Sequence, residues 1–132
     1  KPKQKPILLK IAPDLSEEAI LEIVEILHES KLDGVIATNT TIDRSVLTCD
    51  VKRVEEIGAG GLSGAPLTKK STEVVRLLRK HTSLPIIASG GVMTAEDAIE
   101  KFKAGANLVQ LYTGFIYEGP SLVKQILRRL PK

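Results

Sequence analysis

The residues best suited to chemistry are a lysine inside an apolar run and a cluster of small polar side chains after the next such run. Lys10 lies near the end of the run 7–12. Burying its ammonium is costly unless it meets an anion or extends to water from an edge strand. We favour the anion because ligands bind at that end of parallel strands. Thr38, Asn39 and Thr40 suit a planar ligand with C=O and N–H groups, although such residues also form turns and caps.

Glycine-rich loops could bring backbone N–H groups close to a phosphate. The segment 58–64 holds four glycines and Ser63. It does not match the dinucleotide fingerprint, so a flexible surface turn explains it equally well. Ser89-Gly90-Gly91 and Thr113-Gly114 follow two consecutive apolar runs. If those runs are the last strands of an eight-stranded barrel, both loops lie where phosphates are commonly held; otherwise they are ordinary tight turns.

Four short apolar runs, each followed by a polar loop and a helical pattern, must position these groups. The runs cover 7–12, 34–39, 85–91 and 108–114, and each has the length of a buried parallel strand. The order βαβαβαβα predicts an α/β fold with a parallel sheet and right-handed crossovers. Because ligands bind at the C-terminal edge of such sheets, four strand ends in 132 residues predict a site that is only half present.

Capping residues mark the expected helices. Ser16 followed by Glu17 and Glu18 predicts a helix start, and Thr94 with Asp97 has the spacing of a capping box. Further signals are Gly105 as a helix end, Pro120-Ser121 as a helix start, and the apolar stripe Val74, Val75, Leu77 and Leu78. The segment 39–67 shows no strong helix, and long irregular connections of this kind form lids or binding loops.

Composition indicates one domain with an aliphatic core, since 42% of residues are hydrophobic and only 3% are aromatic. A net charge of +3 without an aromatic and basic stripe argues against a nucleic-acid partner. The single cysteine, Cys49, excludes an internal disulfide and fits a reducing compartment. His28 and His81 show no metal-ligand spacing. No apolar stretch approaches the roughly 18 residues of a membrane span, and the abrupt opening on a strand leads us to expect preceding chain.

Five motifs in order resemble the C-terminal half of the class 2, quinone-dependent dihydroorotate dehydrogenases, over nearly the whole chain, 1–132. The motifs are Leu9-Lys10-Ile11-Ala12-Pro13-Asp14-Leu15, Thr38-Asn39-Thr40-Thr41, Gly60-Gly61-Leu62-Ser63-Gly64, Ser89-Gly90-Gly91-Val92 and Leu108-Val109-Gln110-Leu111-Tyr112-Thr113-Gly114. The resemblance implies the last four βα units of a TIM (β/α)8 barrel that holds FMN at its C-terminal face. It also implies oxidation of dihydroorotate to orotate in pyrimidine biosynthesis, with a quinone as electron acceptor.

The resemblance also assigns roles to individual residues. Lys10 is similar to the family's flavin lysine, which stabilises the charge on the N1–O2 edge of reduced FMN. The cofactor residues implied are Lys10, Thr38, Ser63, Gly64, Gly90, Gly91, Tyr112 and Thr113, the last four flanking the phosphate. Asn39 and Thr40 are similar to the pair that hydrogen-bonds the pyrimidine substrate.

The same resemblance places other parts of the enzyme upstream of this chain. The family's catalytic serine, several flavin and substrate asparagines and the quinone tunnel belong there, so no serine here is assigned as the base. Ser89 departs from the residue common in the family at that position.

A bacterial member would lie on the cytoplasmic face of the inner membrane, without a transmembrane segment in this chain. We expect the segment alone to be inactive and to self-associate. Two alternatives to the dehydrogenase interpretation stay open: a phosphate-binding barrel enzyme without flavin, and a truncated fragment with no activity.

Overall fold

A parallel sheet of four strands forms the centre of the computed structural model, which describes residues 5–130. The strands are β1 (Leu8–Ile11), β2 (Gly34–Ala37), β3 (Ile86–Ser89) and β4 (Leu108–Gln110), hydrogen-bonded in the order β1-β2-β3-β4. The parallel sheet predicted from the sequence is therefore confirmed. Each strand is shorter than its apolar run, so Thr38, Asn39, Gly90 and Gly91 lie beyond the sheet, whereas Lys10, Ser89 and Gln110 are strand residues.

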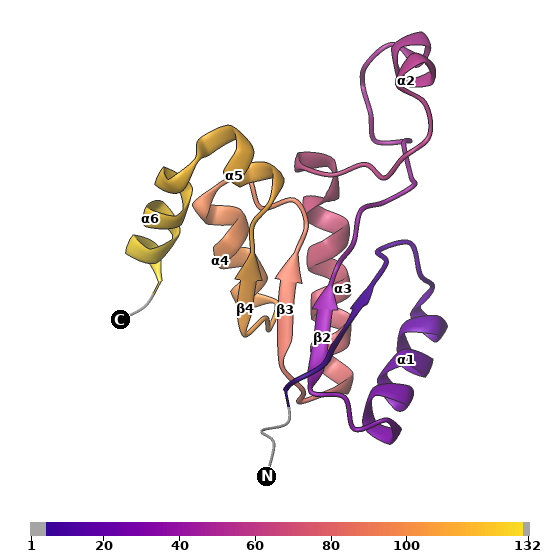
Figure 1. The fold of residues 1–132 in the computed structure, drawn as a ribbon, viewed down its shortest axis with the longest axis vertical. Coiled ribbons are helices and arrows are strands. Elements are labelled where there is room, and N and C mark those ends of the chain that lie inside the picture. Colours follow the sequence, from indigo (N-terminus) through magenta and orange to yellow (C-terminus); the bar gives the residue numbers. More distant parts are fainter. Residues whose placement is uncertain (1–4, 131–132) are drawn as a thin grey trace.

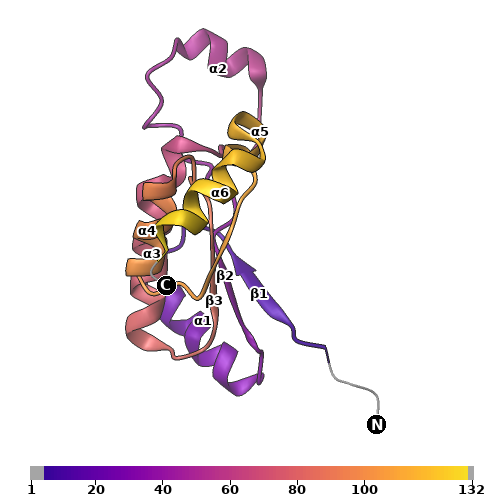
Figure 2. The same cartoon turned by 90° about the vertical axis from the view of Figure 1, so that its left-hand side faces the viewer.

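Helices cover one side of this sheet. They are α1 (Glu17–Glu29), α3 (Thr68–His81) and α4 (Ala95–Lys103), with α6 (Pro120–Arg129) packed against α4. Figure 1 shows the strands pointing the same way, and Figure 2 shows α1, α3 and α4 on one side of them with the other side open. The layout is that of a barrel wall, with helices outside and one sheet face uncovered.

The capping residues act as the sequence predicts. The Ser16 hydroxyl accepts a hydrogen bond from the Ala19 N–H at 3.2 Å. Thr94 and Asp97 form a reciprocal capping box at the start of α4. Gly105 follows the end of α4 with a φ of +109°, a conformation that favours glycine. Pro120 opens α6 as its first residue. These caps fix where each helix leaves the sheet edge.

The apolar core lies between the sheet and its helices. Strand residues that face the helices, such as Val35 and Ile86, pack in one cluster with Leu27 of α1 and Leu78 of α3, and all four are fully buried. A second cluster centred on Ala98 and Leu122 joins α4 to α6. The opposite sheet face carries a row of paired residues, Lys10, Ile36, Ile87 and Leu108. Leu108 is 60% exposed there, so this face has no covering layer in the segment.

Three short helices were not predicted from the sequence. The connection 39–67 contains α2 (Val51–Ile57) and the 3₁₀ helix η1 (Ala65–Leu67), and α5 (Thr113–Glu118) follows β4. Within 39–67, where the sequence shows no strong helix, the structure has the short helix α2. Val51, Val54 and Ile57 recur there every three residues, but the helix has only seven residues and buries none of them, so the pattern was too short to predict it. His81 lies in the last turn of α3. Within 5–130 no helix is long and apolar enough to cross a membrane.

Candidate functional site

All ten residues that the sequence predicts for cofactor and substrate binding line one pocket, of about 120 Å³. The lining residues come from the C-terminal ends of the strands and from the loops that follow them. Figure 1 shows the connections to α2 and α5 leaving the sheet at this same end. Five further residues line it: Ser89 and Gly114, which belong to the predicted phosphate loops, and Leu67, Val92 and Gln110, to which the sequence analysis gave no role. Gln110 is the last residue of β4, and its place on the open face follows from strand alternation once the register is known.

Lys10 lies on the open face of β1 and its side chain is exposed. The sequence predicted a lysine in a strand buried on both faces, and that expectation is wrong for this segment because helices cover only one face. Lys10 pairs with Ile36 in the register and lines the pocket together with Thr38. In a closed barrel this face would turn inward, so the ammonium is placed to meet an anion at the pocket.

The Gly90-Gly91 loop approaches the start of α3 very closely. Gly91 has a φ of +70°, and a Cβ there would overlap the Thr68 backbone. The Thr68 hydroxyl donates a hydrogen bond to the Gly91 carbonyl at 2.5 Å, and the Ser71 hydroxyl donates to the Gly90 carbonyl at 2.8 Å. Glycine is thus required at this turn by both conformation and space.

The loop after β4 approaches the glycine segment 58–64 at the other end of the pocket. The Thr113 hydroxyl donates to the Ser63 hydroxyl at 3.1 Å, and a Cβ on Gly64 would lie 3.2 Å from the Thr113 methyl. Gly114 packs against the Val92 carbonyl, where a Cβ would overlap. Across 5–130, the N–H groups of Thr113 and Gly114 have no hydrogen-bond acceptor, so both are available to an anion.

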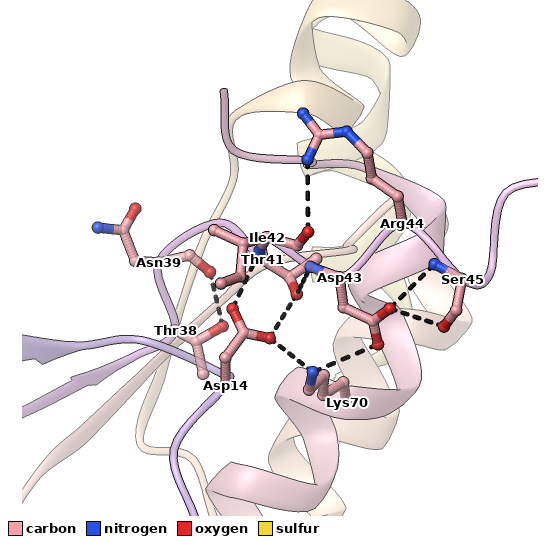
Figure 3. Close-up of polar contacts among 9 residues, drawn as sticks. All are labelled: Asp14, Thr38, Asn39, Thr41, Ile42, Asp43, Arg44, Ser45 and Lys70. Atoms are coloured by element: carbon pink, nitrogen blue, oxygen red, sulfur yellow. Dashed lines mark hydrogen bonds and ion pairs between the residues drawn. The ribbon is translucent and has the colours of Figure 1, made fainter. Parts of the chain in front are cut away.

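Asn39 and Thr40 lie at the exit of β2, which the chain leaves through a cis peptide bond between Ala37 and Thr38. The Thr38 N–H donates to the Ser89 carbonyl at 2.6 Å, which keeps Thr38 buried. Asn39 Oδ1 accepts from the Thr40 N–H at 2.9 Å, so the Asn39 amide NH₂ group remains free toward solvent and the pocket. Figure 3 shows the Asn39 side chain pointing away from the ion pairs that follow it.

An ion-pair network anchors the segment just beyond Thr40. Thr41 donates to Asp14 Oδ1 at 2.5 Å, and Lys70 Nζ lies 2.6 Å from the same oxygen. Lys70 is also 3.6 Å from Asp43 Oδ2 (Figure 3). Partial burial alone would raise the pKa of Asp14, but hydrogen bonds from Lys70, Thr41 and the Ile42 N–H hold it below its ordinary value. The hydrogen bond to Asp14 raises the pKa of Lys70.

A buried lysine behind the glycine loop was missed by the sequence analysis. Lys101 of α4 has no exposed surface, and its Nζ donates to the Thr68 carbonyl at 2.9 Å and to Thr72 Oγ1 at 2.6 Å. A third bond joins it to Ser71 Oγ. Burial lowers the pKa of Lys101 to about 8, while the charge of Asp97 acts in the opposite direction. Its spacing of three residues from Ala98, on the buried side of α4, was the signal available.

Metal binding finds no support in the described residues, since 5–130 hold no cluster of three His, Cys, Asp or Glu side chains that could bind an ion. The pocket instead combines backbone N–H groups, hydroxyls, the amides of Asn39 and Gln110, and one ammonium. That set of donors fits a ligand with an anionic group at one end and a polar planar group at the other.

Comparisons with known proteins agree on one family. The family model for dihydroorotate dehydrogenase matches residues 1–132. A curated relative, the dihydroorotate dehydrogenase (quinone) of Christiangramia forsetii, is 58% identical over 98% of this chain. The protein of the same name from Trichodesmium erythraeum is 51% identical over 98% of it. The crystal structure of DHODH from Eimeria tenella in complex with ferulenol superposes with a TM-score of 0.84 and 42% identity over 94% of this chain.

The chain spans about a third of the length of these relatives: 38% of the Christiangramia forsetii protein, 36% of the Trichodesmium erythraeum protein and 33% of the Eimeria tenella chain. The match to the family model covers the full length of this chain. The strand order and the site motifs agree with the resemblance noted in the sequence. The chain therefore belongs to the dihydroorotate dehydrogenase family.

Proposed function

We propose that this segment is the C-terminal half-barrel of a quinone-dependent dihydroorotate dehydrogenase and supplies half of its FMN and substrate site. The observation that carries the proposal is the convergence of all ten predicted residues on one pocket at the C-terminal sheet edge. The quinone relatives at 50–58% identity support the same class. When bound, FMN would accept a hydride from dihydroorotate and pass the electrons on to a quinone.

The phosphate of FMN would lie between the Gly90-Gly91 loop and the start of α5. Free N–H groups at Thr113 and Gly114, and the absence of a Cβ at Gly91, give an anion both donors and close approach to the backbone. Tyr112 lines the pocket beside them. Ser63 and Gly64 would approach the same ligand from the opposite loop. The donor set therefore fits this cofactor.

Lys10 and Thr38 would hold the isoalloxazine end of the cofactor. The Lys10 ammonium is free of ion pairs within 5–130, so it can stabilise negative charge on a ligand placed against the open face. Asn39 and Thr40 would orient the pyrimidine, since their amide and hydroxyl groups can donate and accept hydrogen bonds together. Proton removal would fall to a residue outside this segment.

The quinone and the membrane would be reached through chain upstream of this segment. A quinone is an apolar acceptor that resides in the bilayer, and no helix of 5–130 can span one. In a bacterium the complete enzyme would then lie peripherally on the cytoplasmic face of the inner membrane.

A visible spectrum of the complete enzyme that carries this segment tests the proposal. We expect flavin absorption bands that bleach when dihydroorotate is added without oxygen and return when a quinone follows. A protein with no flavin bands that still binds inorganic phosphate would favour the alternative, a phosphate-binding barrel with different chemistry. Flavin bands that dihydroorotate leaves unchanged would contradict the substrate assignment alone.

A further inference from the structure

Among the residues that the structure describes, Lys101 is the only charged residue that is buried. An ammonium has three N–H donors and no acceptor. Its three contacts are the Thr68 carbonyl, Thr72 Oγ1 and Ser71 Oγ, so every donor is used and no carboxylate is bonded to it. Burying a charge in this way is costly unless the position has a use for it.

The ammonium sets the direction of the hydrogen bonds around it. Because Lys101 can only donate, the Ser71 oxygen must accept from it and keeps its own hydrogen for another partner. Two carbonyls lie within its reach, Gly90 at 2.8 Å and Thr68 at 3.2 Å, and the shorter distance assigns the hydrogen to Gly90. Thr68, whose carbonyl Lys101 also holds, donates its hydroxyl hydrogen to the Gly91 carbonyl at 2.5 Å. An oriented chain of hydrogen bonds thus leads from Lys101 through Ser71 to the Gly90 carbonyl, and Lys101 also holds the backbone of Thr68, whose hydroxyl fixes the Gly91 carbonyl.

The geometry of the peptide unit transmits this orientation to the other side of the loop. In a trans peptide the C=O and the following N–H point in opposite directions, and the only cis bond in 5–130 is elsewhere. Carbonyls of Gly90 and Gly91 directed at α3 therefore turn the N–H groups of Gly91 and Val92 away from it. Neither N–H has an acceptor within 5–130, and both residues line the pocket.

We propose that Lys101 is a positioning residue for the FMN phosphate, which fixes the glycine loop from behind so that the Gly91 and Val92 N–H groups face the phosphate, and which adds a buried positive charge behind that loop. The inference rests on the proposed function. It assigns Lys101 no contact with the cofactor. It explains why a lysine, rather than an apolar residue, fills the space between α3 and α4.

The charge of Lys101 supports this role. With a pKa lowered to about 8 by burial, the side chain is still mainly protonated at pH 7 and can act as a donor. A phosphate on the far side of the loop would favour the charged form further, because opposite charges raise the pKa of a lysine. Charge burial at this position and anion binding in the pocket would thus stabilise each other.

The test compares FMN with riboflavin, which lacks the phosphate, on the apo form of the complete enzyme. Dissociation constants are measured by quenching of flavin fluorescence for the parent, Lys101→Met, Ser71→Ala and the control Lys103→Met. Lys103 lies on the same helix but is exposed and bonds only Glu100, at 3.1 Å. Met keeps the length and apolar bulk of lysine without its charge or donors.

We expect Lys101→Met to weaken FMN binding by about tenfold or more while riboflavin binding changes less than about threefold. Ser71→Ala should raise the ratio of the FMN to the riboflavin dissociation constant by a smaller factor, and Lys103→Met should leave this ratio unchanged. Equal weakening of both flavins by Lys101→Met would overturn the inference, because a merely structural lysine affects both. If Lys101→Met does not fold, an unchanged ratio in Ser71→Ala overturns it instead. A parent enzyme that binds neither flavin would refute the proposed function itself.

Discussion

The two sides of the pocket are held by lysines in opposite environments. Lys101, behind the Gly90-Gly91 loop, is fully buried and bonded only to hydroxyl and carbonyl oxygens. Lys70, beneath the exit of β2, is 37% exposed and lies between the carboxylates of Asp14 and Asp43. The first arrangement fixes a backbone loop in one conformation, which suits the proposed binding of the FMN phosphate. The second arrangement holds the start of the long connection 39–67 through ion pairs that solvent screens, and such pairs cost little to rearrange.

This difference predicts unequal sensitivity of the two sides to mutation. Removing a partner from the buried network leaves polar groups without hydrogen bonds in a place that water does not reach, which costs about 1–3 kcal/mol per group. Removing a partner from the exposed network lets water replace it, so the cost is within about 1 kcal/mol. The predictions below test this contrast, in order of decreasing effect.

Separation of the segment from the upstream half should have the largest effect. Its open sheet face, with Leu108 60% exposed, and the free edges of β1 and β4 would lose the layers that cover them in a barrel. We expect the isolated chain to dimerise, aggregate or lose fixed packing. Light scattering and chemical denaturation measure this, and a compact monomer that unfolds cooperatively at high concentration would contradict the half-barrel assignment.

Substitution Gly91→Ala should be the most damaging single change at the pocket. The new Cβ would overlap the Thr68 backbone in a left-handed conformation, and strain and overpacking together cost about 2–5 kcal/mol. We expect a lower free energy of unfolding and loss of bound flavin from the complete enzyme. Gly58→Ala is the matched control, because Gly58 has a φ of +82° but no atom within 4 Å of its Cβ position. Equal losses in both variants would refute the close-approach argument.

The sequence predicted the scaffold well because the scaffold depends on local patterns. The apolar runs and the caps at Ser16 and Thr94 act over a few residues, so the parallel strands and the starts of α1 and α4 followed from them. The family motifs likewise named ten residues that line one pocket. The sequence left open whether Lys10 meets an anion or extends to water from an edge strand; it is exposed on edge strand β1 here, because its environment depends on a covering layer outside the segment. Lys101 was missed because its three oxygen partners come from α3, about 30 residues earlier in the chain.

Lys10→Met in the complete enzyme should lower the reduction potential of the flavin by tens of millivolts. If the ammonium faces the N1–O2 edge, the reduced flavin loses its counter-charge, and about 1.4 kcal/mol corresponds to about 30 mV for two electrons. Reduction by substrate should slow accordingly. The control is Lys80→Met, an exposed lysine near the end of α3 at the opposite edge of the sheet. A redox titration that gives an unchanged potential with FMN bound would remove Lys10 from the site.

Asp14→Asn should cost about 1 kcal/mol of folding free energy, discounted for solvent screening, because Asn keeps one acceptor for Thr41 but loses the charge that holds Lys70. We expect a raised KM for dihydroorotate with little change in FMN affinity, since the anchored segment carries Asn39 and Thr40. Steady-state kinetics and urea unfolding measure these effects. Arg53→Gln, which removes an exposed pair to Glu56, is the control and should change neither. A loss of FMN affinity in Asp14→Asn would contradict the division between the two sides.

The contribution of Asp14 should also depend on pH in a defined direction. Its pKa in the folded protein lies below the ordinary value of 3.8, so between the two values the unfolded chain binds more protons than the folded one. The stabilisation is therefore complete above about pH 5 and is lost as the pH falls through 3.8 toward the folded value. The stability difference between the parent and Asp14→Asn should stay constant from pH 7 to pH 5 and shrink near pH 3. A difference that grows on acidification would reverse the sign of this argument.

The central claim is that this segment carries one half of a single flavin site. Complementation tests it most directly: the 132-residue chain and the upstream half of the barrel are produced separately, then refolded alone and together with FMN. We predict that neither half alone oxidises dihydroorotate, and that the mixture gains flavin absorption bands and quinone-dependent activity. Dihydroorotate oxidation by the segment alone, free of complete enzyme, would contradict the account.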